Sequence, residues 1–130
     1  MASSFLTPLV RDPERRFALR HLPSGRVLAR RVEAAFDSQR RRKGLLGRTS
    51  LDADTALVLA PCAAIHTFFM SFAIDVLFVR RDGRIMKACR AVRPWRIRLA
   101  PGSFAVVEFG VGALERTGAV SGGSVELAAE

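Results

Sequence analysis

The stretch CAAIHTFFMSFAIDVLFV, from Cys62 to Val79, decides the fold. Apolar, aromatic and β-branched residues fill it, which is typical of strands buried in a sheet. Only His66, Asp75 and the thiol of Cys62 can ionise within this stretch. Burying an ionisable group without a partner costs free energy. We therefore expect each of these groups to be hydrogen-bonded or to lie at a site.

Signals for strands and turns continue on both sides of this stretch. Asp82-Gly83 separates two apolar runs, and this dipeptide predicts a type I′ hairpin. Alternation along the strand expected at 65–70 would place His66, Phe68 and Met70 on one face. The expected strands cover residues 17–22, 26–32, 56–59, 65–70, 76–79, 84–91, 103–109 and 124–127. The expected helices run from a cap at Asp37 or Ser38 to about Leu46, and from Gly112 to Thr117, with Gly47 and Gly118 as their C-terminal stops.

These elements predict an α+β fold. About eight short strands at this spacing favour a mostly antiparallel sheet or a partly open small barrel, accompanied by two short helices. No βαβ repeat indicates a doubly wound parallel sheet. The length of 130 residues fits one domain. With Pro8 and Pro13 as breakers, we expect residues 1–14 to form a flexible leader and residues 15–130 a single globular domain.

The charge is strongly positive and unevenly distributed. The net charge is +9, and residues 1–50 hold 12 basic and 4 acidic residues. A basic half can mark contact with nucleic acid or an acidic partner. A source genome rich in G and C would enrich arginine equally well. No nucleic-acid motif accompanies the charge, so nucleic acid is not the partner we expect first.

Targeting signals and metal motifs are weak in this sequence. Cys62 and Cys89 are too few for a disulfide scaffold. Together with His21 and His66 they lack the tight ligand spacing of a zinc site, so we expect no metal and no cofactor. No apolar run approaches the roughly 20 residues of a membrane helix. The first residues lack the features of a signal peptide, and we expect a cytoplasmic protein.

The candidate functional residues lie in and around the apolar stretch. Histidine is suited to proton transfer near neutral pH, so His66 could act as a general base with Asp75 or Glu108 as its orienting group. Asp75 could instead cap a turn or pair with Arg48. Glu108, among apolar neighbours in a strand, also needs a partner. The catalytic candidates are His66, Asp75 and Glu108; the ligand-binding candidates are Arg48, His66, Met70, Asp75, Trp95 and Glu108.

Several motifs together resemble the uncharacterised family called domain of unknown function 192, over roughly residues 15–127. Gly123-Ser124 departs from the family's usual Gly-Asp, and Leu46 stands where Met is usual. The resemblance implies a compact, largely β fold with a short helix after the first hairpin, and it brings no activity with it. The matching motifs are 43–48 (KGLLGR), 65–70 (IHTFFM), 74–78 (IDVLF), Asp82-Gly83, Val107-Glu108, Gly112, Arg116 and Gly118.

Three functional hypotheses follow from these features. The leading one is a binding or accessory module for a small molecule or a protein, with a polar pocket around His66 and Asp75. The second is a small enzyme that uses His66 as its general base. The third is a basic interaction module that binds nucleic acid or an acidic protein through residues 11–48. The sequence does not specify the ligand, the activity or the oligomeric state.

Overall fold

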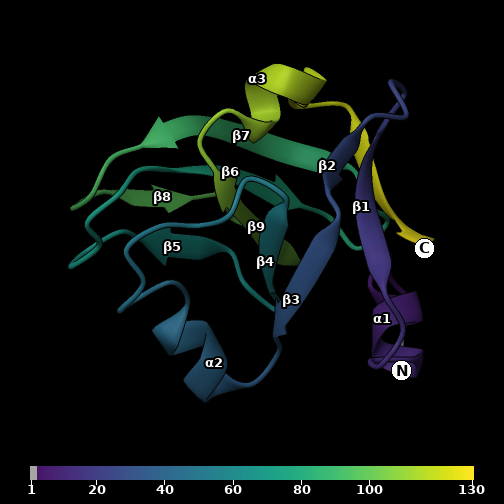
Figure 1. Ribbon diagram of the computed structural model, residues 1–130, viewed down its shortest axis with the longest axis horizontal. Helices are drawn as coiled ribbons and strands as arrows, with labels where there is room; N and C mark the ends of the chain where they lie inside the picture. The colour runs from purple at the N-terminus through teal and green to yellow at the C-terminus, as the bar shows by residue number, and fades with distance from the viewer. Residues whose placement is uncertain (1–2) are drawn as a thin grey trace.

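The computed structural model describes residues 3–130 and is built around one mixed five-stranded sheet (Figure 1). Its strand order is β3-β4-β9-β6-β7. All neighbouring strands are antiparallel except β3 and β4, which are parallel and are joined through the helix α2. The strands are β3 (Arg31–Ala35), β4 (Thr55–Leu59), β6 (Ile74–Val79), β7 (Ile85–Val92) and β9 (Ala105–Gly110).

Two smaller sheets and three short helices complete the fold. One sheet has the order β10-β1-β2, and the other pairs β5 with β8. Figure 1 shows β10 and β1 near the two termini and the β5–β8 pair toward the opposite end of the molecule. These strands are β1 (Phe17–Leu22), β2 (Val27–Ala29), β5 (Ala64–His66), β8 (Ile97–Leu99) and β10 (Ser124–Ala129); the helices are α1 (Thr7–Arg11), α2 (Ser38–Lys43) and α3 (Ala113–Thr117).

Both faces of the central sheet are covered, which explains why its inner strands are apolar throughout. Every residue of β4 and of β6 is buried. Alternation along β6 sends Leu77 and Val79 into one core cluster and Val76 and Phe78 into the other. A strand that is buried on both faces reads as a continuous apolar run, as residues 74–79 largely do. Asp75 is the exception, and it lies on the face of Leu77.

The predicted α+β class is confirmed, with differences in detail. The structure contains ten strands and three short helices, and the sheets formed by residues 3–130 remain open. The expected strand 26–32 is divided at Arg30 into β2 and β3. The parallel pairing of β3 with β4 was not expected, because the short helix between them is polar and gives no sign of a crossover.

Two local predictions are wrong. The strand expected at 65–70 ends at His66, because Thr67 turns to bond with Arg96 and Phe69 adopts a φ of 66°. The turn at Asp82-Gly83 is not type I′, which needs a positive φ at both residues. Only Gly83 has one, at 95°, while the carboxylate of Asp82 accepts the N–H of Arg84 at 2.9 Å.

The N-terminal end of α2 lies where it was predicted, and the C-terminal end does not. Asp37 caps the helix as expected, and its carboxylate accepts the N–H of Arg40 at 2.7 Å. The helix ends at Lys43, earlier than the expected Leu46, because Gly44 adopts a φ of 46°. Gly47 also has a positive φ, within the loop that follows.

The segment expected to be a leader contains α1 and two buried side chains, Leu6 and Leu9. Leu6 packs in the core cluster that also holds Leu77 and Val79. None of the helices in residues 3–130 has the length and apolar character to cross a bilayer.

Candidate functional site

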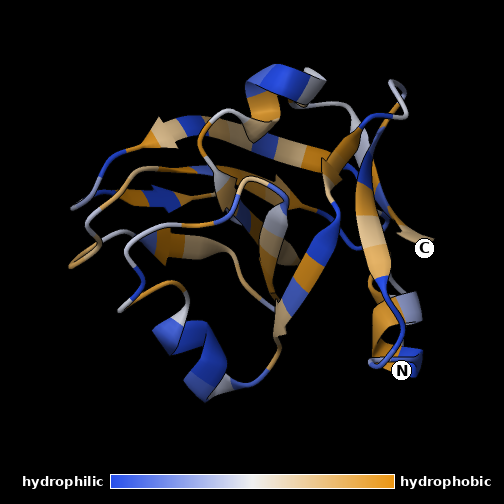
Figure 2. Ribbon diagram, in the orientation of Figure 1, coloured by the Kyte–Doolittle hydropathy of each residue, from blue (hydrophilic) through white to orange (hydrophobic). Residues whose placement is uncertain are grey.

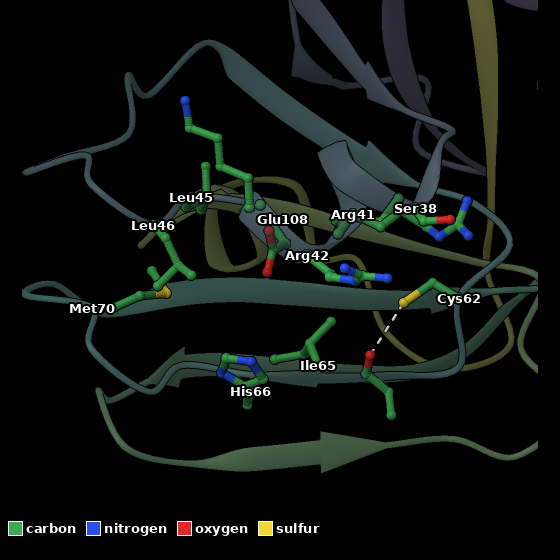
Figure 3. A pocket seen from close by; sticks show the side chains of 14 residues that line it. Ser38, Arg41, Arg42, Leu45, Leu46, Cys62, Ile65, His66, Met70 and Glu108 are labelled. Carbon is green, nitrogen blue, oxygen red and sulfur yellow. Dashed lines mark hydrogen bonds between the residues drawn. The ribbon is translucent and has the colours of Figure 1, made fainter.

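A hollow of about 330 Å³ lies between α2, with the loop that follows it, and β5 (Figure 3). Leucine, isoleucine and methionine side chains form much of its wall, and arginine and lysine from α2 lie along one side. The lining residues are Ser38, Arg41, Arg42, Lys43, Gly44, Leu45, Leu46, Leu59, Cys62, Ala64, Ile65, His66, Met70 and Glu108. Three of the predicted site residues, His66, Met70 and Glu108, therefore meet in one place.

Glu108 supplies the only carboxylate of this lining. It lies in the middle of β9, between Leu57 of β4 and Val76 of β6. Only 4% of the residue is exposed, and its Oε1 has no hydrogen-bond partner. Burial raises the pKa of Glu108 from 4.5 to about 7, against an opposing effect of the nearby Arg48 guanidinium. Figure 3 shows this carboxylate pointing into the space between α2 and β5.

Cations of α2 lie near this carboxylate without pairing with it. Arg41 is held by the backbone, because its Nη1 donates to the carbonyl of Phe36 at 2.7 Å and of Ala60 at 3.3 Å. Gly44 lies beside the carboxylate, since a Cβ at this position would be in ordinary contact with Glu108 Oε1, at 3.9 Å. Its φ of 46° favours glycine. The pocket thus combines a buried acid, an apolar wall and a positive rim.

Cys62 and His66 lie on the β5 side of the pocket. The Cys62 thiol donates to the carbonyl of Ala64 at 3.1 Å, and burial raises its pKa. A raised pKa lowers the thiolate fraction and disfavours a nucleophilic role. His66 is exposed, and its Nδ1 accepts the N–H of Phe68 at 3.2 Å. In residues 3–130, no hydrogen bond joins His66 to a carboxylate.

Asp75 lies on the opposite face of the sheet from Glu108. It is 1% exposed, and its carboxylate accepts three backbone N–H groups. Oδ1 accepts from Ala91 at 2.8 Å, and Oδ2 accepts from Gly112 at 3.0 Å and from Leu114 at 3.1 Å. Of the roles considered for Asp75, the structure displays the cap. The arrangement ties β6 to the end of β7 and to the start of α3.

Arg48 and Trp95 also lie outside the pocket. Arg48 pairs with Glu33 through two hydrogen bonds of 2.8 and 3.2 Å, and does not meet Asp75. It lines an adjoining hollow together with Glu33 and Gly44. Trp95 lies in the loop between β7 and β8. No three His, Cys, Asp or Glu side chains within residues 3–130 gather closely enough to hold a metal ion.

Sequence reasoning did not include Arg41 or Cys62 among the site residues. A run of four charged residues such as 40–43 is typical of a solvated helix face, and Arg42 and Lys43 are indeed exposed. Arg41 is half-buried because it reaches back to Phe36 and Ala60. The acceptor carbonyl of Ala60 lies 19 residues away along the chain, so local sequence offers no signal for this contact.

The chain is similar to known proteins over most of its length. The model of the family domain of unknown function 192, described as "Uncharacterized ACR", matches residues 20–127. No curated protein matches the chain. A protein of unknown function from Novosphingobium aromaticivorans DSM 12444 shares 28% identity at a TM-score of 0.73, over 85% of this chain and 83% of that one. A putative transcription regulator from Sinorhizobium meliloti 1021 shares 21% identity at a TM-score of 0.76, over 98% and 97% of the two chains.

Proposed function

The chain belongs to the uncharacterised family domain of unknown function 192, and we propose that it is a binding module whose ligand is held at Glu108. The ligand class that fits is a small amphipathic anion with a hydrogen-bond donor at the end remote from its charge. The observation that carries the proposal is the buried Glu108 Oε1, which has no partner within residues 3–130.

An unpartnered buried acceptor is costly, which is why the great majority of buried polar atoms in proteins are hydrogen-bonded. Leaving one unsatisfied costs about 1–3 kcal/mol. Glu108 stands among apolar strand residues, where Leu or Val would pack without this cost. A hydroxyl, amide or amine of a ligand would satisfy Oε1 and recover that free energy on binding.

The rest of the lining supports the other features of the ligand. Apolar side chains of Leu45, Ile65 and Met70 face the hollow and would contact a hydrocarbon segment. Arg42 and Lys43 are exposed at its edge and would attract a carboxylate or phosphate. The volume of about 330 Å³ lies at the small end of ligand pockets.

A matched set of probes tests this proposal. We would titrate the protein with hexanoate and with ω-hydroxyhexanoate, repeat the pair with butanoate and octanoate chains, and measure affinities from amide chemical shifts. Above the pKa of Glu108, we expect at least one ω-hydroxy acid to bind about tenfold more tightly than its unsubstituted partner, which corresponds to one good hydrogen bond. We expect shifted amides around 43–46 and 64–66.

The Glu108→Leu variant removes the acceptor and keeps the strand apolar, so it should fold and lose the preference for hydroxy acids. Glu115→Gln, at an exposed carboxylate on α3, should keep that preference. Equal affinities within every pair of acids would contradict the proposal. A hydroxyl preference that survives in Glu108→Leu would contradict it as well.

A further inference from the structure

A ladder of four rings stands at the edge of the pocket, formed by the last residue of β5, the loop after β5 and the loop before β8. His66 stacks on Phe68 with centroids 4.9 Å apart, and Phe68 stacks on Trp95 at 5.6 Å. Phe69 lies against Trp95 at 4.7 Å and a tilt of 59°. The two loops that carry the rings lie together at the end of the molecule remote from both termini (Figure 1).

Large apolar side chains are exposed here at high density. Phe69 is 76% exposed, and Trp95 is 55% exposed. On β8, Ile97 and Leu99 are 55% and 50% exposed. These four residues, which we call the apolar ridge, are a majority of the seven exposed large hydrophobics in residues 3–130. Figure 2 shows the hydrophobic colour at the tip of the loop after β5. Concentrated apolar exposure of this kind marks an interaction site.

The ridge is held in place by a hydrogen-bonded clamp. Thr67 is fully buried, and its hydroxyl donates to the carbonyl of Arg93 at 2.6 Å and accepts the N–H of Arg96 at 2.9 Å. Its backbone adds bonds to the N–H of Trp95 and the carbonyl of Arg96, at 3.0 and 2.9 Å. Hydrogen bonds of Thr67 therefore join the two loops that expose these apolar rings.

Backbone strain accompanies this exposure. Phe69 and Trp95 adopt φ angles of 66° and 65°, a region that bulky residues rarely occupy. Such conformations cost about 1–3 kcal/mol each and persist where the surroundings impose them, most often at functional sites. Here the clamp at Thr67 imposes them, and the result is that both rings project outward.

The surroundings of the ridge are positively charged. Residues 56–74 and 83–107, which carry the ridge and its supports, contain no Asp and no Glu. Five cations lie on β7, on β8 and in the loop between them, and the Nζ of Lys87 donates to the carbonyl of Leu99 at 3.1 Å. They are Lys87, Arg90, Arg93, Arg96 and Arg98.

We propose that the apolar ridge docks this protein on the surface of an anionic lipid bilayer. Phe69 and Trp95 would enter the interface, where aromatic side chains are favoured, and the arginines would meet the lipid phosphates. The ridge lies at a projecting end of the molecule, which suits a broad surface. Ile97 and Leu99 extend it with aliphatic groups, which suit acyl chains.

Two other occupants fit these observations less well. Single-stranded nucleic acid needs free ring faces for base stacking, and each of these rings already has at least one neighbouring ring against it, which leaves fewer faces for bases. A second copy of the chain would bring five cations against five like cations without acidic residues between them, which is repulsive.

The test uses Trp95 as its own reporter, because it is the only tryptophan of the chain and there is no tyrosine. We would record its emission while adding vesicles of phosphatidylcholine, alone or mixed with phosphatidylglycerol. We expect a blue shift with the mixed vesicles and quenching by lipids brominated in the acyl chain near the headgroup. Binding should weaken as salt is added.

Matched variants separate the apolar and the ionic contributions. Phe69→Ala with Ile97→Ala should weaken binding at least about tenfold, while Val111→Ala with Val120→Ala, which are also exposed, should not. The pair Arg93→Gln and Arg96→Gln should weaken it about thirtyfold. The control pair Arg15→Gln and Arg16→Gln has the same net charge and should have little effect.

Three outcomes would overturn the proposal. The first is a Trp95 emission that does not respond to phosphatidylglycerol. The second is quenching of Trp95 by oligothymidylate at lower concentrations than any response to lipid, which would assign the ridge to nucleic acid. The third is a blue shift that depends on protein concentration in the absence of vesicles, which would assign it to self-association.

Discussion

Glu108 destabilises the folded protein, because its charged carboxylate is excluded from water and its Oε1 has no hydrogen-bond partner within residues 3–130. Asp75 is buried as deeply and differs in having three N–H donors, so its charge is compensated. The two acids therefore have opposite roles. Asp75 stabilises the fold that holds the site, whereas the unpartnered Glu108 destabilises the folded protein, a cost that the ligand we propose would reduce on binding.

This cost makes the stability of the protein depend on pH. The pKa of Glu108 is 4.5 in the unfolded chain and about 7 in the folded protein, so between these values the folded state binds more protons. The free energy of unfolding should therefore fall as pH rises through this window. The contribution of Glu108 to the fall is on the order of 3 kcal/mol, at roughly 1.4 kcal/mol per pKa unit.

Urea denaturation across this pH range measures the effect as a difference between proteins. Glu108→Gln does not titrate and should lack this part of the slope, whereas Glu115→Gln should keep it. The buried His21 is present in all three proteins, so its own contribution cancels. Parallel pH profiles for Glu108→Gln and the wild type would contradict the raised pKa.

At the scale of secondary-structure elements, alternation along strands was the most informative sequence signal. It predicts that Glu108 faces the side of Val106 and away from Val107 and Phe109, and the two core clusters confirm this division. The turns were harder to predict. The chain leaves the extended conformation at Thr67 because its hydroxyl bonds with residues 26 and 29 positions away. The local sequence pattern cannot predict a contact between residues so far apart in the chain.

The candidate site was predictable to a similar extent. One pocket was expected around His66, Met70, Asp75, Arg48 and Glu108. His66, Met70 and Glu108 share the lining of one pocket, whereas Asp75 and Arg48 do not line it. The sequence could not place Asp75 on the other face, because its position depends on the register between β6 and β9 and on where α3 begins. Nor could it indicate that Arg48 pairs with Glu33, since the two residues lie 15 positions apart and no local pattern links them.

The role of Asp75 at this scale leads to a prediction for Asp75→Asn. An amide NH₂ would replace one acceptor oxygen and face the backbone N–H groups that this oxygen now accepts. We expect the free energy of unfolding to fall by about 3 kcal/mol, as measured by urea denaturation. Asp82→Asn is the matched control, because Asp82 is exposed and accepts a single N–H. Its cost should stay below about 1 kcal/mol. A similar fall in the free energy of unfolding in the two variants would contradict the role of Asp75 in joining β6 to β7 and α3.

At the scale of the whole molecule, charge is poorly compensated. The chain carries 21 basic residues and 12 acidic ones. Within residues 3–130 only two ion pairs form, Arg40 with Asp37 and Arg48 with Glu33, and both are solvent-exposed. Exposed pairs contribute little stability. Repulsion among the remaining cations therefore outweighs attraction, and it is greatest when the chain is compact.

Screening this repulsion should stabilise the fold. We expect the midpoint of thermal unfolding to rise by a few degrees as NaCl is increased from low to physiological ionic strength, where the Debye length shortens to about 8 Å. KCl should give the same rise, since screening depends on ionic strength. A fall in the midpoint would mean that attractive pairs dominate. A rise with phosphate at an ionic strength where NaCl has no effect would assign the stabilisation to a specific anion site, in contradiction to a general repulsion.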